Sequence, residues 1–193
     1  MEETDREEER LEFNRNIHLQ SISKSLNEDA FFTEFFPRLY EESVNNDFFR
    51  FTILYQVVEY LIDKILHPIV LREIKKNPET RELKDTLSER FRINILFNEC
   101  VNLSNDVQRS FKDAYDKFIQ HLGSNIESKN GSHNQIYFVR NTIYHNLRKL
   151  DNNFLEGGCL KEINLAFEKI ILELLLNYND ISESSDSQAT QTP

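Results

Sequence analysis

Residues 134–150 combine the side chains best suited to chemistry on a phosphodiester. At about 100° per residue, the apolar residues of this segment predict one buried helix face, formed by Ile136, Val139, Ile143, Leu147 and Leu150. The other side of the helix carries guanidinium, imidazole, amide and phenol groups: Tyr137, Arg140, Asn141, Tyr144, His145 and Arg148, with Lys149 next in the chain. This polar face contains no carboxylate.

Each of these groups has a defined use on a phosphate. Arginine offers planar, paired donors to phosphate oxygens, and histidine can take up and release a proton near neutral pH. Arg140 and His145 are five residues apart, about 140° around the helix, so they could hold a group between them. The same spacing occurs in structural helices, and a structural role would instead pair Arg140 with an acid and pack His145 in the core.

The charge distribution makes this segment the most favourable surface for a polyanion. The net charge of the chain is -10, but residues 1–12 hold seven acids and two bases, and residues 180–193 hold three acids and no bases, which leaves -2 for residues 13–179. Residues 129–150 contain four bases, two histidines and no acid. A polyanion would therefore bind most favourably at this segment, and nothing in the sequence predicts DNA binding.

The composition predicts an all-helical fold. Glycine and proline are scarce, at four each in 193 residues, which favours long helices with few connections. We expect a central helix capped by Asn46 or Asp47, a short aromatic helix interrupted by Pro37 that packs in the core rather than stacking bases, and a helix that starts at Pro68. The remaining expected helices span residues 79–101, 104–122 (ended by Gly123), 134–150 and 160–178. Residues 1–12 and 180–193 are expected to be disordered tails around one domain, residues 13–179.

Several classes of protein are disfavoured. No stretch approaches the roughly 18–20 apolar residues that span a bilayer, and the acidic start MEETDREEERLE differs from a signal peptide, so we expect a cytoplasmic protein without membrane contact. Cys100 and Cys159 are expected to be buried thiols rather than a disulfide or a zinc site. No phosphate-binding glycine loop, GxSxG or HExxH motif is present, and no cofactor is predicted.

Carboxylates within apolar stretches raise a separate question. Glu59, Asp63 and His67 follow one another at steps of four, which would suit a metal ion, although a solvated helix face is the simpler interpretation and no metal is predicted. Because Glu59 lies among apolar neighbours, it should have a basic partner, and Arg140 and His145 are the candidates. Glu173, inside the run IILELLL, raises the same question without a nameable partner.

The string YFVRNTIYHNLRKL, with Arg140 and His145 at its centre, resembles the signature of the HEPN superfamily. That signature is an arginine, four to six residues and a histidine, often with a small polar residue directly after the arginine, here Asn141. It lies near the start of a late helix in a small helical bundle. The upstream stretch FFRFTILYQVVEYLIDKI resembles the early helix of the Apea-like HEPN branch. The resemblance in fold spans roughly residues 30–178, and its specific part covers about a dozen residues.

The resemblance implies a helical bundle of the HEPN type and a ribonuclease that cuts RNA without a metal, as a homodimer with both motifs in one cleft. Arg140 and His145 would be the catalytic pair and Asn141 a polar helper, with Tyr144, Arg148, Lys149 and Tyr137 supporting them or the RNA. A toxin or anti-phage role, with an antitoxin or defence-system protein as partner, would fit such an enzyme. The alternative is a non-catalytic HEPN-like module that binds RNA or protein.

Overall fold

The computed structural model describes residues 22–76, 88–123, 128–145 and 158–180, and every regular element in these ranges is helical. The predicted all-helical fold is thereby confirmed for the described part of the chain. The elements, of which the two marked η are π-helical turns, are η1 (Phe31–Phe35), α2 (Phe36–Glu42), α3 (Asp47–Lys64), α4 (Leu66–Lys76), α6 (Glu89–Ile95), η2 (Leu96–Cys100), α7 (Asn105–Leu122), α8 (Ser132–His145) and α10 (Cys159–Asn177).

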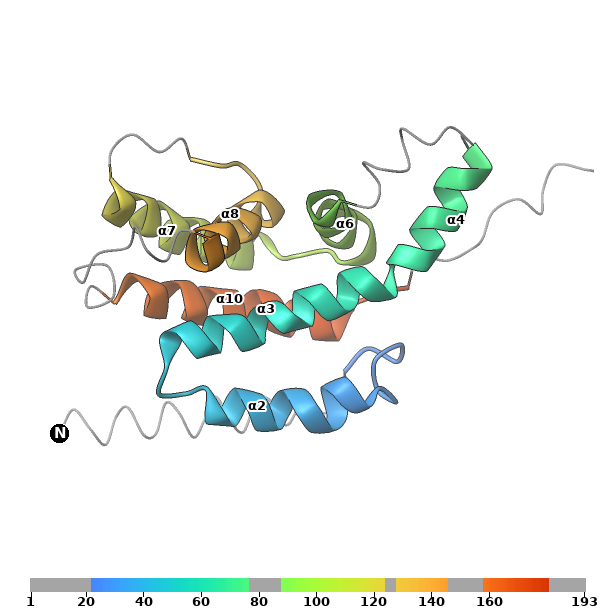
Figure 1. Ribbon diagram of the computed structural model, residues 1–193, viewed down its shortest axis with the longest axis horizontal. Helices are drawn as coiled ribbons and strands as arrows, with labels where there is room; N and C mark the ends of the chain where they lie inside the picture. Colours follow the sequence, from blue (N-terminus) through green and yellow to red (C-terminus); the bar gives the residue numbers. More distant parts are fainter. Residues whose placement is uncertain (1–21, 77–87, 124–127, 146–157, 181–193) are drawn as a thin grey trace, which may run out of the picture.

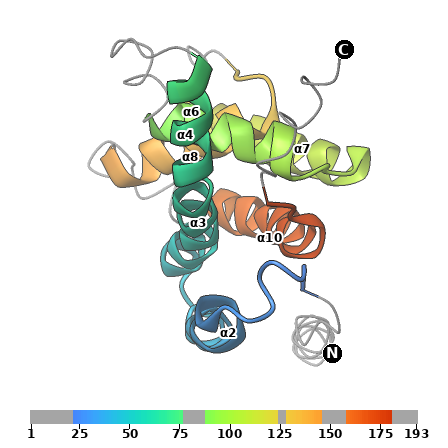
Figure 2. The same ribbon diagram turned by 90° about the vertical axis from the view of Figure 1, so that its right-hand side faces the viewer.

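The helices pack in layers around α3 and α10 (Figure 1). Helix α10 packs against both α3 and α7, while α3 also contacts α2, α4 and α6. Helix α8 packs against α6 and α7 on the side of the bundle opposite α2. A view turned by 90° shows α2 below this arrangement and α4 extending upward from the end of α3 (Figure 2). Helix α8 therefore lies in an outer layer of the bundle, packed on α6 and α7.

Helix α3 forms the centre of the bundle, as its nearly continuous apolar sequence predicted. A helix that is apolar on most sides has to be covered on most sides, and α10 meets it with an equally apolar surface. Ring contacts join the layers, since Phe167 of α10 lies 5.5 Å from Phe51 and 5.9 Å from Phe111, measured between ring centroids. None of the described helices is long and apolar enough to cross a membrane.

Polar side chains fix the helix ends. Asn46, one of the two predicted caps, accepts a hydrogen bond from the backbone N–H of Phe49 at 2.9 Å and caps α3. Gly123 ends α7 with a φ of 114°, as predicted. Glu173 accepts hydrogen bonds from the N–H and hydroxyl of Ser104, at 2.7 and 2.6 Å. Since Ser104 caps α7, Glu173 finds its partner at the start of the neighbouring helix.

Several expected boundaries were wrong or fall elsewhere. Pro37 does not interrupt a helix but occupies the first turn of α2, where its missing N–H costs nothing. Helix α4 begins at Leu66 rather than at Pro68. Cys100 and Cys159 are buried thiols, as expected. The predicted disordered tails, and the end of the predicted helix 134–150, lie outside the described residues.

A buried ion pair that the sequence did not indicate joins α3 to α10. The carboxylate of Glu168, whose side chain is only 2% exposed, contacts Nε of Arg50. Arg50 also donates a hydrogen bond from Nη2 to the hydroxyl of Tyr40 at 2.6 Å, which brings α2 into the same cluster. Burial raises the pKa of Glu168, while Arg50 opposes that rise. Each charge is tolerated in the interior because the other is present.

We predict that Glu168→Ala destabilises the fold by about 3–5 kcal/mol, because it leaves the guanidinium of Arg50 buried without its counter-charge. Glu162→Ala is the matched control, since Glu162 lies on the same helix and pairs with Lys117 at the surface; it should cost only about 0–1 kcal/mol. Urea unfolding monitored by circular dichroism measures both. Equal losses in the two variants would contradict a structural role for the buried pair.

Candidate functional site

The side chain of Arg140 lies between two glutamates from other helices. The apolar face of α8, with Ile136, Val139 and Ile143 buried, turns Arg140 toward α3 and α6. Its Nη2 lies 3.9 Å from Oε1 of Glu59 on α3 and 3.6 Å from Oε1 of Glu89 on α6. Only 19% of the Arg140 side chain remains exposed. Glu59 is thus the partner of Arg140 that the sequence suggested.

This arrangement corrects one expectation. The polar face of α8 carries no carboxylate of its own, but Glu59 and Glu89 bring two to Arg140 from the neighbouring helices. The expectation failed because the side chains of neighbouring helices contribute to the charge of a helix surface in a bundle. Of the two features expected for a purely structural role, one is present, since Arg140 pairs with acids. The other is not, since His145 is exposed rather than packed in the core.

Arg140 also holds the polar residues of its own helix. Its Nη1 donates to Oδ1 of Asn141 at 3.0 Å and lies 3.0 Å from Nε2 of His145. The guanidinium carbon lies 5.7 Å from the ring centre of Tyr55 and 5.3 Å from that of Tyr144, within the range of cation–π attraction. The spacing of five residues therefore brings the two predicted catalytic side chains into direct contact.

The contact between Arg140 and His145 engages one nitrogen of the imidazole. A guanidinium can only donate hydrogen bonds, so Nε2 of His145 acts as the acceptor, and the proton of the neutral ring lies on Nδ1. The Nε2 lone pair therefore faces Arg140, and it can accept another proton only when Arg140 turns to a different acceptor. The ring stands at the exposed end of α8, where a substrate can reach it.

Glu89 and Tyr55 complete the surroundings of Arg140, and neither was predicted. The hydroxyl of Tyr55 donates to Oε1 of Glu89 at 2.6 Å, the same oxygen that faces Arg140. Glu89 opens α6 directly after its capping residue Ser88, so in the sequence it resembles an ordinary acid of a first helical turn. The position of Tyr55 in an apolar helix was the only available signal, because a buried phenol needs a polar partner.

The pKa of Glu59 is raised from its usual value. Burial is the largest cause, and the charge of Glu89 adds to it, while Arg140 and a hydrogen bond from Gln56 oppose it. The anion of Glu59 is therefore costly in the folded protein despite its cationic neighbour. Burial likewise raises the pKa of Tyr55, with Glu89 adding to the effect.

The other predicted site residues have different positions. Tyr144 is 38% exposed, and its ring lies 6.4 Å from that of Phe48. Tyr137 is half-buried and packs against the core. Arg148 and Lys149 lie outside the described residues.

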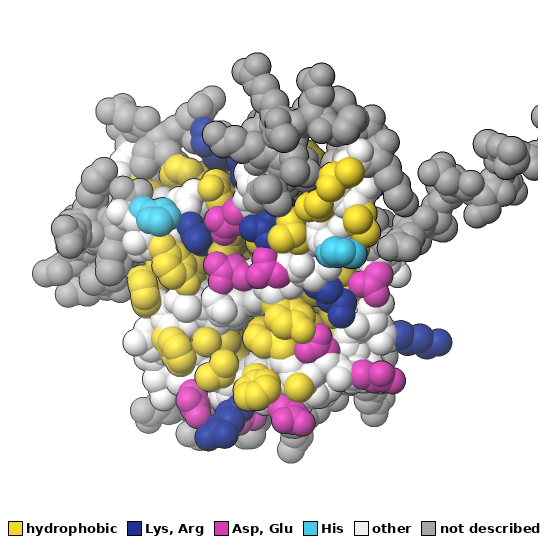
Figure 3. Space-filling view, turned by 45° about the vertical axis from the view of Figure 1, so that its right-hand side comes forward, with side chains coloured by type: hydrophobic (Ala, Val, Ile, Leu, Met, Phe, Trp, Pro, Cys, Tyr) yellow, Lys and Arg dark blue, Asp and Glu magenta, His cyan; other side chains and the backbone are white. Residues whose placement is uncertain are grey.

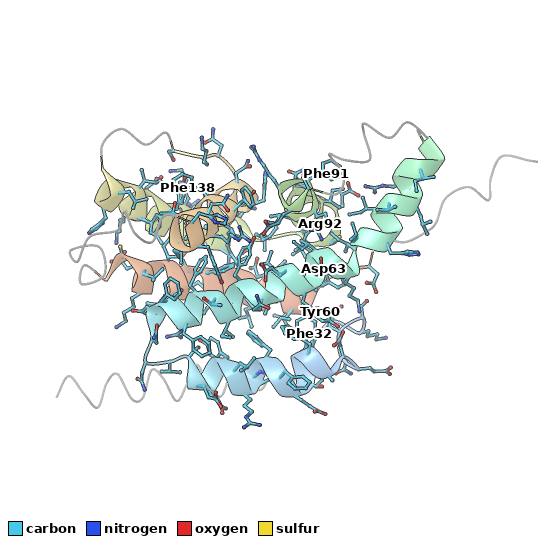
Figure 4. The ribbon with its side chains drawn as sticks, viewed as in Figure 1. Phe32, Tyr60, Asp63, Phe91, Arg92 and Phe138 are labelled. Atoms are coloured by element: carbon cyan, nitrogen blue, oxygen red, sulfur yellow. The ribbon has the colours of Figure 1, made fainter. Side chains whose placement is uncertain are left out.

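An open cavity of about 490 Å³ lies beside Arg140, lined by residues of η1, α3, α6 and α8. On its α6 side, Nη1 of Arg92 donates to Oδ1 of Asp63 at 2.6 Å, and the two side chains meet between α3 and α6 (Figure 4). A space-filling view shows acidic and basic side chains side by side in the middle of the molecule, bordered by hydrophobic ones (Figure 3). Mixed charge on an apolar surround suits a polar ligand.

Glu59, Asp63 and His67, which follow one another at intervals of four residues, do not form a metal site in the described residues. No group of three or more His, Cys, Asp or Glu side chains there could hold a metal ion. Asp63 turns to Arg92 instead of converging with Glu59 and His67.

Comparison with known proteins found no match: no family model, curated protein or solved structure matches the chain.

We predict that Glu59→Gln raises the melting temperature relative to the wild type by an amount that grows from about pH 4 to about pH 7. Because the pKa of Glu59 is raised in the folded protein, the native state keeps this proton where the unfolded chain has lost it, and ionisation above that range costs stability. Glutamine removes that cost. Thermal unfolding across the pH range measures the difference. A gain that shrinks with rising pH would mean that Arg140 stabilises the anion more than burial opposes it.

Proposed function

We propose that this chain is a metal-independent endoribonuclease of the HEPN type that cleaves RNA in a cleft shared by two copies of the chain. The observation that carries the proposal is the direct contact between Arg140 and His145 at the exposed end of α8, 3.0 Å from Nη1 to Nε2. A permanent cation and an accessible proton acceptor side by side are what cleavage by a ribose hydroxyl needs.

The two side chains would act at different atoms. When Arg140 turns from His145 to the phosphate, Nε2 of His145 becomes free to take the proton of the ribose 2′-hydroxyl, whose oxygen attacks the adjacent phosphorus. Arg140 donates to the non-bridging oxygens, where negative charge accumulates. The new bond joins the 2′-oxygen to phosphorus, and the bond from phosphorus to the 5′-oxygen breaks. The products are a 2′,3′-cyclic phosphate and a 5′-hydroxyl.

A second copy would supply what one copy lacks. The departing 5′-oxygen needs a proton, and the motif contains a single histidine, which has just accepted one. Two motifs facing each other across a two-fold axis provide one histidine as base and one as acid, together with two arginines on one phosphate. The exposure of His145 and Tyr144 at the end of α8 leaves this end open for such pairing.

The supporting residues follow from their contacts with Arg140. Asn141 and Tyr144 orient its guanidinium, while Arg148, Lys149 and Tyr137 are the remaining candidates for holding RNA. Cleavage of this kind would suit a toxin or anti-phage protein in the cytoplasm, restrained by an antitoxin or a larger defence complex.

One observation favours a second candidate function, a non-catalytic HEPN-like module that binds RNA or a partner protein. Glu59 and Glu89 already meet the charge of Arg140 and repel an incoming phosphate. In an enzyme, the phosphate has to displace or outcompete these carboxylates. In a binding module, the three side chains would simply hold α3, α6 and α8 together.

We predict RNA cleavage in the presence of EDTA by the wild-type protein. His145→Ala and Arg140→Ala should each lower the rate about 10²- to 10⁴-fold, the range for losing a proton-transfer group or a charge-stabilising donor. His121→Ala is the control, because His121 is an exposed histidine of α7 that bonds to its own helix. Unchanged cleavage by His145→Ala would exclude the assignment, and RNA binding without any wild-type cleavage would favour the second candidate.

We also predict that cleavage depends on a dimer. Light scattering after gel filtration should give twice the mass of one chain, and the rate per chain should rise with protein concentration through the range in which the dimer forms. Full activity from a species that remains monomeric at every concentration would contradict the shared cleft.

A further inference from the structure

The cavity beside Arg140 has the size and lining of a site for one nucleobase. Its volume of about 490 Å³ lies within the range of small-molecule sites, roughly 300–1,000 Å³. Arg140, which would hold the scissile phosphate, is itself part of the lining. A nucleotide whose phosphate contacts Arg140 would therefore have its base within reach of this cavity.

Glu59 is an acceptor in the lining with unused capacity. Its Oε2 accepts a hydrogen bond from Gln56, but its Oε1 lies 3.9 Å from Nη2 of Arg140, which is too far for a hydrogen bond. The corresponding oxygen of Glu89 is already engaged by Tyr55 at 2.6 Å. A carboxylate that is partly withdrawn from water and incompletely bonded gains from a ligand that donates to it.

The charges of the lining favour a donor as well. Three carboxylates, those of Glu59, Asp63 and Glu89, face the cavity together with two guanidinium groups, those of Arg92 and Arg140. Asp63 pairs with Arg92 at 2.6 Å, so the remaining excess of negative charge lies around Arg140. A base edge rich in N–H groups would complement it, whereas an edge of carbonyl oxygens would be repelled.

Two aromatic rings give the cavity a stacking surface. Phe31 and Tyr60 both line it, and their rings are parallel to within 2° at a centroid distance of 4.5 Å. The hydroxyl of Tyr60 donates to Asp29, and its ring meets that of Phe32 of η1 edge to face at a centroid distance of 5.2 Å (Figure 4). Unpaired bases stack on half-buried aromatic rings of this kind.

We propose that the cavity binds guanine next to the cleaved bond and that Glu59 determines this specificity. Guanine presents N1–H and its 2-amino group side by side, two donors that one carboxylate accepts together. Adenine and cytosine each offer one donor beside an acceptor on this edge, and uracil offers one N–H between two carbonyl oxygens. The inference rests on the proposed function, because it uses Arg140 as the holder of the neighbouring phosphate.

The test is binding of short RNA by the full-length His145→Ala protein, which cannot degrade its ligand under the proposed mechanism. Fluorescence anisotropy compares uridine hexamers that carry guanosine, inosine or adenosine at one internal position. Guanosine should bind about tenfold more tightly than adenosine, since a paired contact to a base discriminates by this order. Inosine, which lacks only the 2-amino group, should lose most of that advantage.

A second substitution assigns the preference to Glu59. Adding Glu59→Gln should remove the advantage of guanosine over adenosine, whatever change in affinity the two hexamers share, whereas adding Glu41→Gln, an exposed acid of α2 outside the cavity, should preserve it. Equal binding of all three hexamers, or a guanosine preference that survives Glu59→Gln, overturns the inference. The inosine comparison needs no change at Glu59, so it decides even if that variant does not fold.

The two proposals fail separately. A guanosine preference without cleavage by the wild-type protein overturns the nuclease and leaves the base site. Cleavage in EDTA without a guanosine preference overturns the base site and leaves the nuclease. Absence of RNA binding by every variant overturns both.

Discussion

A guanidinium cannot release its proton to escape burial, so Arg140 has to be met by negative charge wherever it is withdrawn from water. Glu59 and Glu89 meet it from α3 and α6, and Tyr55 fixes Glu89 from below. The contact forms only when three helices are packed as observed. His145 depends on it in turn, because its ring bonds to the same guanidinium.

The same interaction sets a limit on function. Carboxylates that hold an arginine in position also weaken its attraction for phosphate, and the balance depends on how firmly each carries its charge. The pKa of Glu59 is raised by burial and by Glu89, so its negative charge is costly even beside Arg140, and a ligand that donates hydrogen bonds to it would offset that cost. Arg140 is thus held by one carboxylate anchored through Tyr55 and by another whose charge is costly. Under the proposed function, a phosphate would have to compete with both carboxylates for Arg140.

The sequence predicted the features that depend on the periodicity of a single helix, or on a charge in an apolar run that requires a partner of opposite sign. Periodicity identified the buried face of α8, and an acid in the apolar run around Glu59 required a cation, for which Arg140 was one of two candidates. The sequence did not predict the features that depend on how the helices pack against one another. Glu89 reaches the site from a part of the chain with no unusual composition, and the pairing of Arg50 with Glu168 joins residues 118 positions apart. The charge around Arg140 could not be predicted from the sequence of α8 alone, because the neighbouring helices contribute carboxylates to the same surface.

The near-neutral balance of residues 13–179 bears on how such a site would choose its substrate. Affinity for nucleic acid that comes from phosphate contacts is independent of sequence and grows with the number of cations, and around Arg140 cations do not exceed acids. Discrimination must then come from groups that recognise bases. Acceptor oxygens and stacked rings can do so because they respond to the edge and face of a base rather than to its phosphate. If the chain binds RNA as proposed, the carboxylates that oppose indiscriminate binding are thus the groups best suited to selecting one base within it.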